Sequence, residues 1–211
     1  MRPNFYAEHN TDKIIREELF PDLSFRGVMV EVGGGTPEFL SMSRHFKESG
    51  WRTIIIEPNP EFVEQHRRIG NEVHQFACSS EDCSDVPFTV VSQKTKAYGG
   101  IVTDHSFSSI NIKPEYAALM PASAKAKKIL VEVRRLDGLL IKLGLAKIDL
   151  LSIDVEGWEI EVLQGFDTKK IKCPVIVIEN FNHDPSYTRY MLRLGYKLIR
   201  QIEYNYIFQK N

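Results

Sequence analysis

The sequence has little cysteine, and its three cysteines form no recognisable pattern. Cys78, Cys83 and Cys173 are an odd number and include no CxxC pair. This argues against a disulfide framework and against a structural zinc site. We therefore expect reduced thiols, and we expect Cys173, at the start of an apolar run, to be a small buried residue.

Long apolar runs and an excess of charge of either sign are also absent. No apolar stretch approaches the roughly 20 residues that span a bilayer, and the opening MRPNFYAEHN lacks the apolar core of a signal peptide. Lys and Arg number 27 and Asp and Glu 28, so there is no electrostatic case for a nucleic-acid or membrane partner. We expect a cytoplasmic protein; a homo-oligomer is left open.

The rest of the composition is that of an ordinary folded protein. The chain has 211 residues, of which 43% are hydrophobic, enough for one domain with a substantial core. Strand-length apolar runs alternate with helical patterns, which is typical of βαβ units and a parallel sheet. We predict one domain over residues 1–211 with an α/β fold: a three-layer α-β-α sandwich whose twisted, mostly parallel seven-stranded sheet ends in a C-terminal antiparallel hairpin.

The pattern also assigns the individual segments. Strands are expected at residues 28–32, 52–58, 72–78, 149–154, 173–180, 196–203 and 204–210, with further strand signals at 87–93 and 130–136. Helices are expected at residues 11–20, 37–50, 59–70, 137–145, 156–166 and 185–195. Residues 1–24 form an N-terminal helical segment. Residues 94–116 carry few periodic signals, and we predict an irregular loop there on the substrate side.

Glycines and acids follow the first two predicted strands, at the edge where α/β sheets bind ligands. The first strand contains Glu31 next to its last residue and is followed directly by Gly33, Gly34 and Gly35, which allow a ligand to approach the backbone. An acid about 20 residues after such a turn usually accepts hydrogen bonds from a ribose. Glu57 stands in that position, so the two segments together predict a nucleoside site.

The turn does not match a dinucleotide fingerprint. The pattern G-x-G-x-x-G would need a third glycine where this chain has Glu38, and a carboxylate there would repel a pyrophosphate. The expected ligand is a nucleoside without a pyrophosphate, with a cationic end that Glu31 would attract. S-adenosylmethionine has this chemistry: an adenine, a ribose and a cationic methionine tail.

A signature of known enzymes lies further along the chain. The run DVEGWE at 154–159, continued by Val162, Leu163 and Gly165, resembles the D-V-E-G-x-E-x-x-V-L-x-G signature of FkbM-type methyltransferases. The E-P-N-P turn at 57–60 and the L-D-x-L-L segment at 136–140 are similar to that family as well.

The resemblance implies a class I S-adenosylmethionine-dependent methyltransferase with a Rossmann-like sheet. It implies that Glu57, Pro58 and Asn59 bind the cofactor. It also implies backbone contacts to adenine around Ala77 and Cys78.

Asp154 and Glu156 leave the predicted strand at 149–154 near the centre of the expected cleft, and two interpretations stay open. Either the two acids act in catalysis, with Asp154 also close to the cofactor, or Asp154 orders the loop and Glu156 satisfies helix N-terminal amides. His183 follows the next strand; it is a candidate general base or a solvated loop residue.

A third acid, Glu179, followed by Asn180, ends the strand at 173–180. With Asp154, this pair resembles the magnesium site of catechol-type O-methyltransferases, and oxygen ligands of this kind suit Mg²⁺. Without an ion, Asp154, Glu156 and Glu179 would supply a general base or bind hydroxyl groups.

The residues therefore predict methyl transfer from S-adenosylmethionine to an acceptor, with a hydroxyl oxygen of a small molecule, sugar or glycan as the first choice. A second hypothesis is a nicotinamide-dependent oxidoreductase, which shares the glycine turn and distal acid but would need the missing third glycine and a Y-x-x-x-K pair. A third is a nonenzymatic nucleoside-binding module on a degenerate methyltransferase fold.

Overall fold

The computed structural model describes residues 4–97, 100–104 and 107–211. Side chains are described for these residues except those within 93–106. Its main sheet has seven strands in the order β10-β11-β9-β8-β1-β2-β3. Their bounds are β1 Val28–Val32, β2 Arg52–Ile56, β3 Glu72–His74, β8 Leu150–Ile153, β9 Val175–Glu179, β10 Tyr196–Ile202 and β11 Asn205–Lys210. All neighbours are parallel except β11 against β9 and β10 against β11, so the predicted mostly parallel sheet with a terminal hairpin is confirmed.

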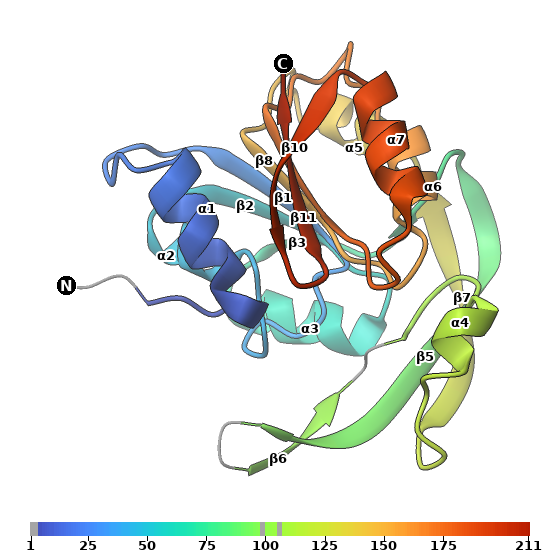
Figure 1. The fold of residues 1–211 in the computed structure, drawn as a ribbon. Coiled ribbons are helices and arrows are strands. Elements are labelled where there is room, and N and C mark those ends of the chain that lie inside the picture. Colours follow the sequence, from blue (N-terminus) through green and yellow to red (C-terminus); the bar gives the residue numbers. More distant parts are fainter. Residues whose placement is uncertain (1–3, 98–99, 105–106) are drawn as a thin grey trace.

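Helices cover both faces of this sheet (Figure 1). On one face, Ile15 of α1 (Thr11–Leu19) and Phe46 of α2 (Arg44–Glu48) pack with apolar side chains of β1, β8, β9 and β11. On the other face, α5 (Leu136–Lys142), α6 (Glu159–Gln164) and α7 (Pro185–Arg193) pack against the alternate residues of the central strands. The central strands are buried on both sides, which explains why they consist of continuous apolar runs.

A second sheet extends away from the main one (Figure 1). Its order is β4-β7-β5-β6, with β4 Ala77–Cys78, β5 Cys83–Ala97, β6 Gly100–Asp104 and β7 Lys125–Arg134. The predicted strand at 72–78 is thus divided between two sheets, because β3 pairs with β2 whereas β4 pairs with β7.

The prediction of an irregular loop over residues 94–116 is wrong for its first part. Residues up to Ala97 belong to β5, and β6 pairs with them in an antiparallel hairpin. Backbone pairing satisfies polar groups without requiring an apolar pattern, which is why periodicity missed it. Residues 98–99 and 105–106 lie outside the described part. From 107 to 113 the chain forms no helix or longer strand, and α4 (Pro114–Ala117) follows.

The predicted helix at 37–50 is also mostly absent, since α2 spans only Arg44–Glu48. The buried Glu31 carboxylate takes an amide that a helix would have used, since its Oε1 accepts from Met42 N at 3.0 Å. Leu40 has a φ of 54°, which no right-handed helix permits.

The other helices are close to the predicted ranges. The N-terminal segment contains the short helix η1 (Glu8–Asn10) before α1, and α3 spans Pro60–Arg68. No helix among the described residues has the length and apolar character needed to cross a membrane.

Candidate active site

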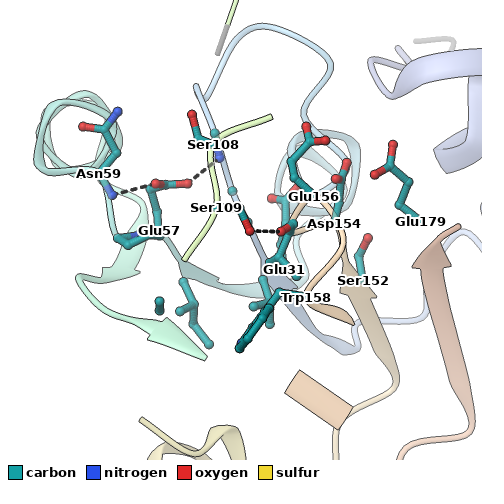
Figure 2. Close-up of a pocket in the computed structure, with 18 of the residues that line it drawn as sticks. Glu31, Glu57, Asn59, Ser108, Ser109, Ser152, Asp154, Glu156, Trp158 and Glu179 are labelled. Carbon is teal, nitrogen blue, oxygen red and sulfur yellow. Dashed lines mark hydrogen bonds between the residues drawn. The ribbon is translucent and has the colours of Figure 1, made fainter. Parts of the chain in front are cut away.

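A cleft of about 310 Å³ lies at the carboxyl ends of β1, β2, β8 and β9. This is the edge of the sheet at which the sequence predicts a ligand. In Figure 2, Glu57 and Asn59 occupy one side of this cleft, and Asp154, Glu156 and Glu179 occupy the other. The loops after the strands, residues 107–110 and the N-terminal segment complete its walls.

At the first position of the glycine turn after β1, no residue other than glycine fits. Gly33 has a φ of +86°, and a Cβ there would lie 1.7 Å from the carbonyl oxygen of Asp154. Gly35 has a φ of +51°, and a Cβ there would meet nothing within 4 Å. The turn is thus packed against the β8 loop on one side and open on the other.

The amides of this turn are used within the protein. Gly33 N and Gly34 N both donate to Ile56 O, at 3.0 and 3.2 Å. Gly35 N donates to Glu57 Oε2 at 2.9 Å. A phosphate-binding turn instead points its amides at the ligand, so these three glycines do not form a pyrophosphate site.

Glu57 is buried in the wall of the cleft, with 5% of its surface exposed. Its Oε1 accepts from Asn59 N at 2.7 Å, and Oε2 accepts from Gly35 N. Burial raises the pKa of Glu57 to about 7, against the two backbone hydrogen bonds, which lower it. Each carboxylate oxygen has a second acceptor position, so Glu57 can accept from ligand hydroxyls while it holds the turn.

Asn59, another predicted cofactor residue, has a structural task as well. Its Oδ1 accepts from Glu61 N at 3.1 Å and so caps α3. Its Nδ2 is buried without a partner in a residue that lines the cleft together with Pro58. An unpaired buried donor costs free energy, which a ligand acceptor would recover.

One end of the cleft is apolar. Ala77 and Cys78, predicted to contact adenine, line it together with aromatic and aliphatic neighbours: Phe62, Phe76, Phe88, Ile110 and Trp158. Burial raises the pKa of the Cys78 thiol, so Cys78 is no nucleophile. The Nε1 of Trp158 donates to Ser79 Oγ at 3.3 Å, which holds the ring in the cleft wall.

The opposite end is acidic. Asp154 follows β8 and Glu179 ends the neighbouring β9, and oxygens of Asp154, Glu156 and Glu179 all lie within 4.8 Å of one another. The Asp154 side chain is exposed to the cleft, yet loss of water within its walls, together with the charge of Glu159, raises its pKa to about 7. Burial and the charge of Asp154 raise the pKa of Glu179. Carboxyl groups this close retain a proton between them near neutral pH.

Glu31 adds a buried carboxylate below this group, with 6% of its surface exposed. Its Oε1 accepts from Met42 N at 3.0 Å, whereas Oε2 is buried without a hydrogen-bond partner. Burial raises the pKa of Glu31 to about 7, and the charge of Asp154 contributes to the increase. An unpartnered carboxylate oxygen at this position fits the predicted contact with a ligand ammonium.

Glu8 is a cleft residue that the sequence analysis missed. It lies in η1, lines the cleft, and its charge contributes to the raised pKa of Asp154. The N-terminal segment reaches this place because Tyr6 OH donates to Glu48 Oε2 at 2.7 Å and His45 Nδ1 lies 2.7 Å from the Asn4 carbonyl. No sequence spacing predicts such long-range contacts.

Taken together, the cleft is strongly acidic. Among the described residues that line it, six carry carboxylates and none is Lys, Arg or His; the six are Glu8, Glu31, Glu57, Asp154, Glu156 and Glu179. Such a cleft attracts a cationic ligand and repels phosphates.

Two predicted residues lie elsewhere. Asn180 was predicted as a metal ligand, but its Oδ1 accepts from Asp184 N and its Nδ2 donates to Asp184 O, in the wall of a separate cavity. His183 was predicted as a general base, but it lines neither cavity, and its Nδ1 lies 2.9 Å from Tyr206 OH. The predicted roles of these two residues in metal binding and catalysis stay predictions.

The structural role considered for Glu156 belongs to Glu159. Glu159 is fully buried; its Oε1 accepts from Val155 N at 3.1 Å and Gly157 N at 3.0 Å, and its Oε2 accepts from Tyr187 OH at 2.6 Å. These bonds hold a loop in which Glu156 has a φ of 58°, a strained conformation for a residue other than glycine. This backbone conformation places the Glu156 carboxylate beside Asp154.

Comparison with known proteins supports the family assignment. The chain matches the family described as "Methyltransferase FkbM domain" over residues 30–198. It is also 30% identical over 168 residues to a protein named Methyltransferase 1 from Beauveria bassiana (strain ARSEF 2860), covering 74% of this chain and 64% of that protein.

Replacing Glu159 with alanine should destabilise the protein, because three buried donors would lose their acceptor. We expect the free energy of unfolding to fall by on the order of 3 kcal/mol, measured by denaturant titration. Glu161→Ala on the same helix is the matched control, since the Oε2 atom of Glu161 has no partner. Equal stability of the two variants would contradict this role of Glu159.

Proposed function

Because this chain belongs to the FkbM family of methyltransferases, we propose that it transfers a methyl group from S-adenosylmethionine to a hydroxyl oxygen of a small molecule or sugar. The observation that carries the proposal is the acidic cleft at the strand ends, in which no described lining residue is basic. A sulfonium nucleoside with an ammonium group complements this charge.

Each part of the cofactor has a counterpart in the described cleft. Glu57 would accept hydrogen bonds from the ribose, and the buried Oε2 of Glu31 would accept from the ammonium. The apolar wall around Phe76, Ala77 and Cys78 would cover the adenine. When bound, the cofactor supplies an activated methyl group; the protein aligns it with the acceptor.

The acids after β8 and β9 would act on the acceptor. Asp154 and Glu179 retain one proton between them near neutral pH, so one carboxylate is available to take the proton of an acceptor hydroxyl. Phe107, Phe181 and Tyr204 line the same end of the cleft, where they offer aromatic faces to a sugar or another ring.

The same acids provide a second way to activate the hydroxyl. The oxygens of Asp154, Glu156 and Glu179 are ligands of the kind that Mg²⁺ takes, and a bound cation would lower the pKa of an acceptor hydroxyl. In this version Glu156 replaces the originally predicted Asn180. Removal of divalent ions distinguishes the two versions, because a carboxylate base works without an ion.

Two features of the cleft argue against the oxidoreductase hypothesis. A dinucleotide carries a pyrophosphate, whereas the amides of the glycine turn are bonded within the protein and the cleft is acidic. These two features would leave the phosphates without donors and close to carboxylates.

Glu57→Ala should weaken binding of S-adenosylmethionine by about 1 to 3 kcal/mol, because the ribose would lose a charged acceptor. Calorimetric titration measures the change. Glu64→Ala on α3 is the control: Glu64 is exposed and pairs with Arg68, so it should leave the affinity unchanged. If Glu57→Ala bound as tightly as the control, Glu57 would not contact the cofactor.

Asp154→Asn should lower turnover at least about 100-fold while largely preserving affinity for S-adenosylmethionine, since an amide cannot take a proton. Turnover is measured as transfer of an isotope-labelled methyl group to a panel of sugars and phenols. For the wild type, the rate should rise with pH through about 7, because Asp154 must lose its proton to act.

Three results would contradict parts of this assignment. Normal turnover of Asp154→Asn would remove Asp154 from catalysis. A wild-type enzyme that loses its activity in a chelator and recovers it with Mg²⁺ would replace the carboxylate base with a bound ion. Methyl transfer to none of the hydroxyl compounds would leave the acceptor class proposed here without support.

A further inference from the structure

His66 on α3 is a buried titratable group that the proposed chemistry does not use. It is fully buried, and its Nε2 lies 3.1 Å from the carbonyl oxygen of Gly35 in the glycine turn. On the other side of the ring, its Nδ1 lies 2.7 Å from Asn71 Nδ2. The imidazole therefore connects the turn with the end of α3.

The hydrogen positions on this ring follow from Lys47. The Lys47 ammonium contacts Asn71 Oδ1, and because an ammonium can only donate, the Asn71 amide must turn its oxygen to Lys47 and its NH₂ group to His66. His66 Nδ1 then accepts, so the neutral ring carries its hydrogen on Nε2 and donates it to Gly35 O. Burial lowers the pKa of His66, which keeps the ring in this neutral form.

Gly35 is thus held from both sides. Its N–H donates to Glu57 and its carbonyl accepts from His66. Gly35 has a φ of +51° and open space where a side chain would be, so no side chain of its own fixes it by packing. The two hydrogen bonds instead hold the backbone of Gly35, in the part of the turn that faces the cleft.

We propose that His66 is a positioning residue for the cofactor: through the Lys47–Asn71–His66 chain it fixes the Gly35 peptide, and with it the turn and Glu57, in the conformation that binds S-adenosylmethionine. The inference rests on the proposed function, since it takes S-adenosylmethionine as the ligand of the turn. His66 would contribute to cofactor affinity but not to the chemical step.

Two substitutions separate the hydrogen bond from the volume of the ring. His66→Phe keeps a ring but cannot donate, and we expect it to weaken binding of S-adenosylmethionine about tenfold while turnover at saturating cofactor stays close to that of the wild type. His66→Gln can place an NH₂ group near the position of Nε2 and should restore affinity to within about threefold. His74→Phe is the control, because His74 does not line the cleft.

The results distinguish failure of this inference from failure of the proposed function. No binding of S-adenosylmethionine to the wild type would refute the proposed function. Normal wild-type binding with an unchanged affinity of His66→Phe would overturn the role of His66 alone. If His66→Phe fails to fold, NMR of the ring nitrogens of His66 in the wild type tests the inference instead, because it identifies the tautomer. Hydrogen on Nε2 is expected, and hydrogen on Nδ1 alone would overturn the inference.

Discussion

Carboxylates are crowded at the carboxyl edge of the sheet without a basic partner among the described residues that line the cleft, and this crowding governs the chemistry of the site. Burial raises the pKa of Glu31, Glu57 and Asp154 to about 7. An acid with a raised pKa binds its proton more tightly in the folded state, so its contribution to the free energy of unfolding is lost as the pH rises toward 7. The positive charge of a bound cationic ligand offsets this loss of stability, because it stabilises the ionised carboxylates in place of the protons that they have released.

Two buried glutamates keep the backbone of the site in place. Glu57 accepts from the amides of Gly35 and Asn59 after β1 and β2, and Glu159 accepts from those of Val155 and Gly157 after β8. The loops after β1 and β8 leave parallel strands in conformations with positive φ and cannot satisfy these amides in a helix or sheet. The same arrangement leaves the amides of the glycine turn unavailable to phosphates, which links the stability of the loops to the choice of ligand.

The sequence predicted the parts that depend on local pattern. The strands of the main sheet, the need for glycine at position 33 and the place of Glu57 in the cleft all follow from apolar runs and strand-end residues. The predicted helix at 37–50 is mostly absent because the buried Glu31 carboxylate takes the Met42 amide, and the β5–β6 hairpin was missed because backbone pairing leaves no apolar signal. Glu8 enters the cleft through contacts distant in sequence. Asn180 and His183 take partners from the loop after β9 and from β11, Asp184 and Tyr206, which spacing alone does not encode.

The central claim is that this cleft binds a cationic nucleoside and not a dinucleotide. Calorimetric titration of the purified protein with S-adenosylmethionine, S-adenosylhomocysteine and NAD, each with and without Mg²⁺, tests it most directly. The account predicts micromolar binding of both adenosyl compounds and none of NAD. Binding of NAD alone would contradict it, since a pyrophosphate would then have found donors in a cleft where the glycine amides are bonded within the protein and the described lining residues include no Lys, Arg or His.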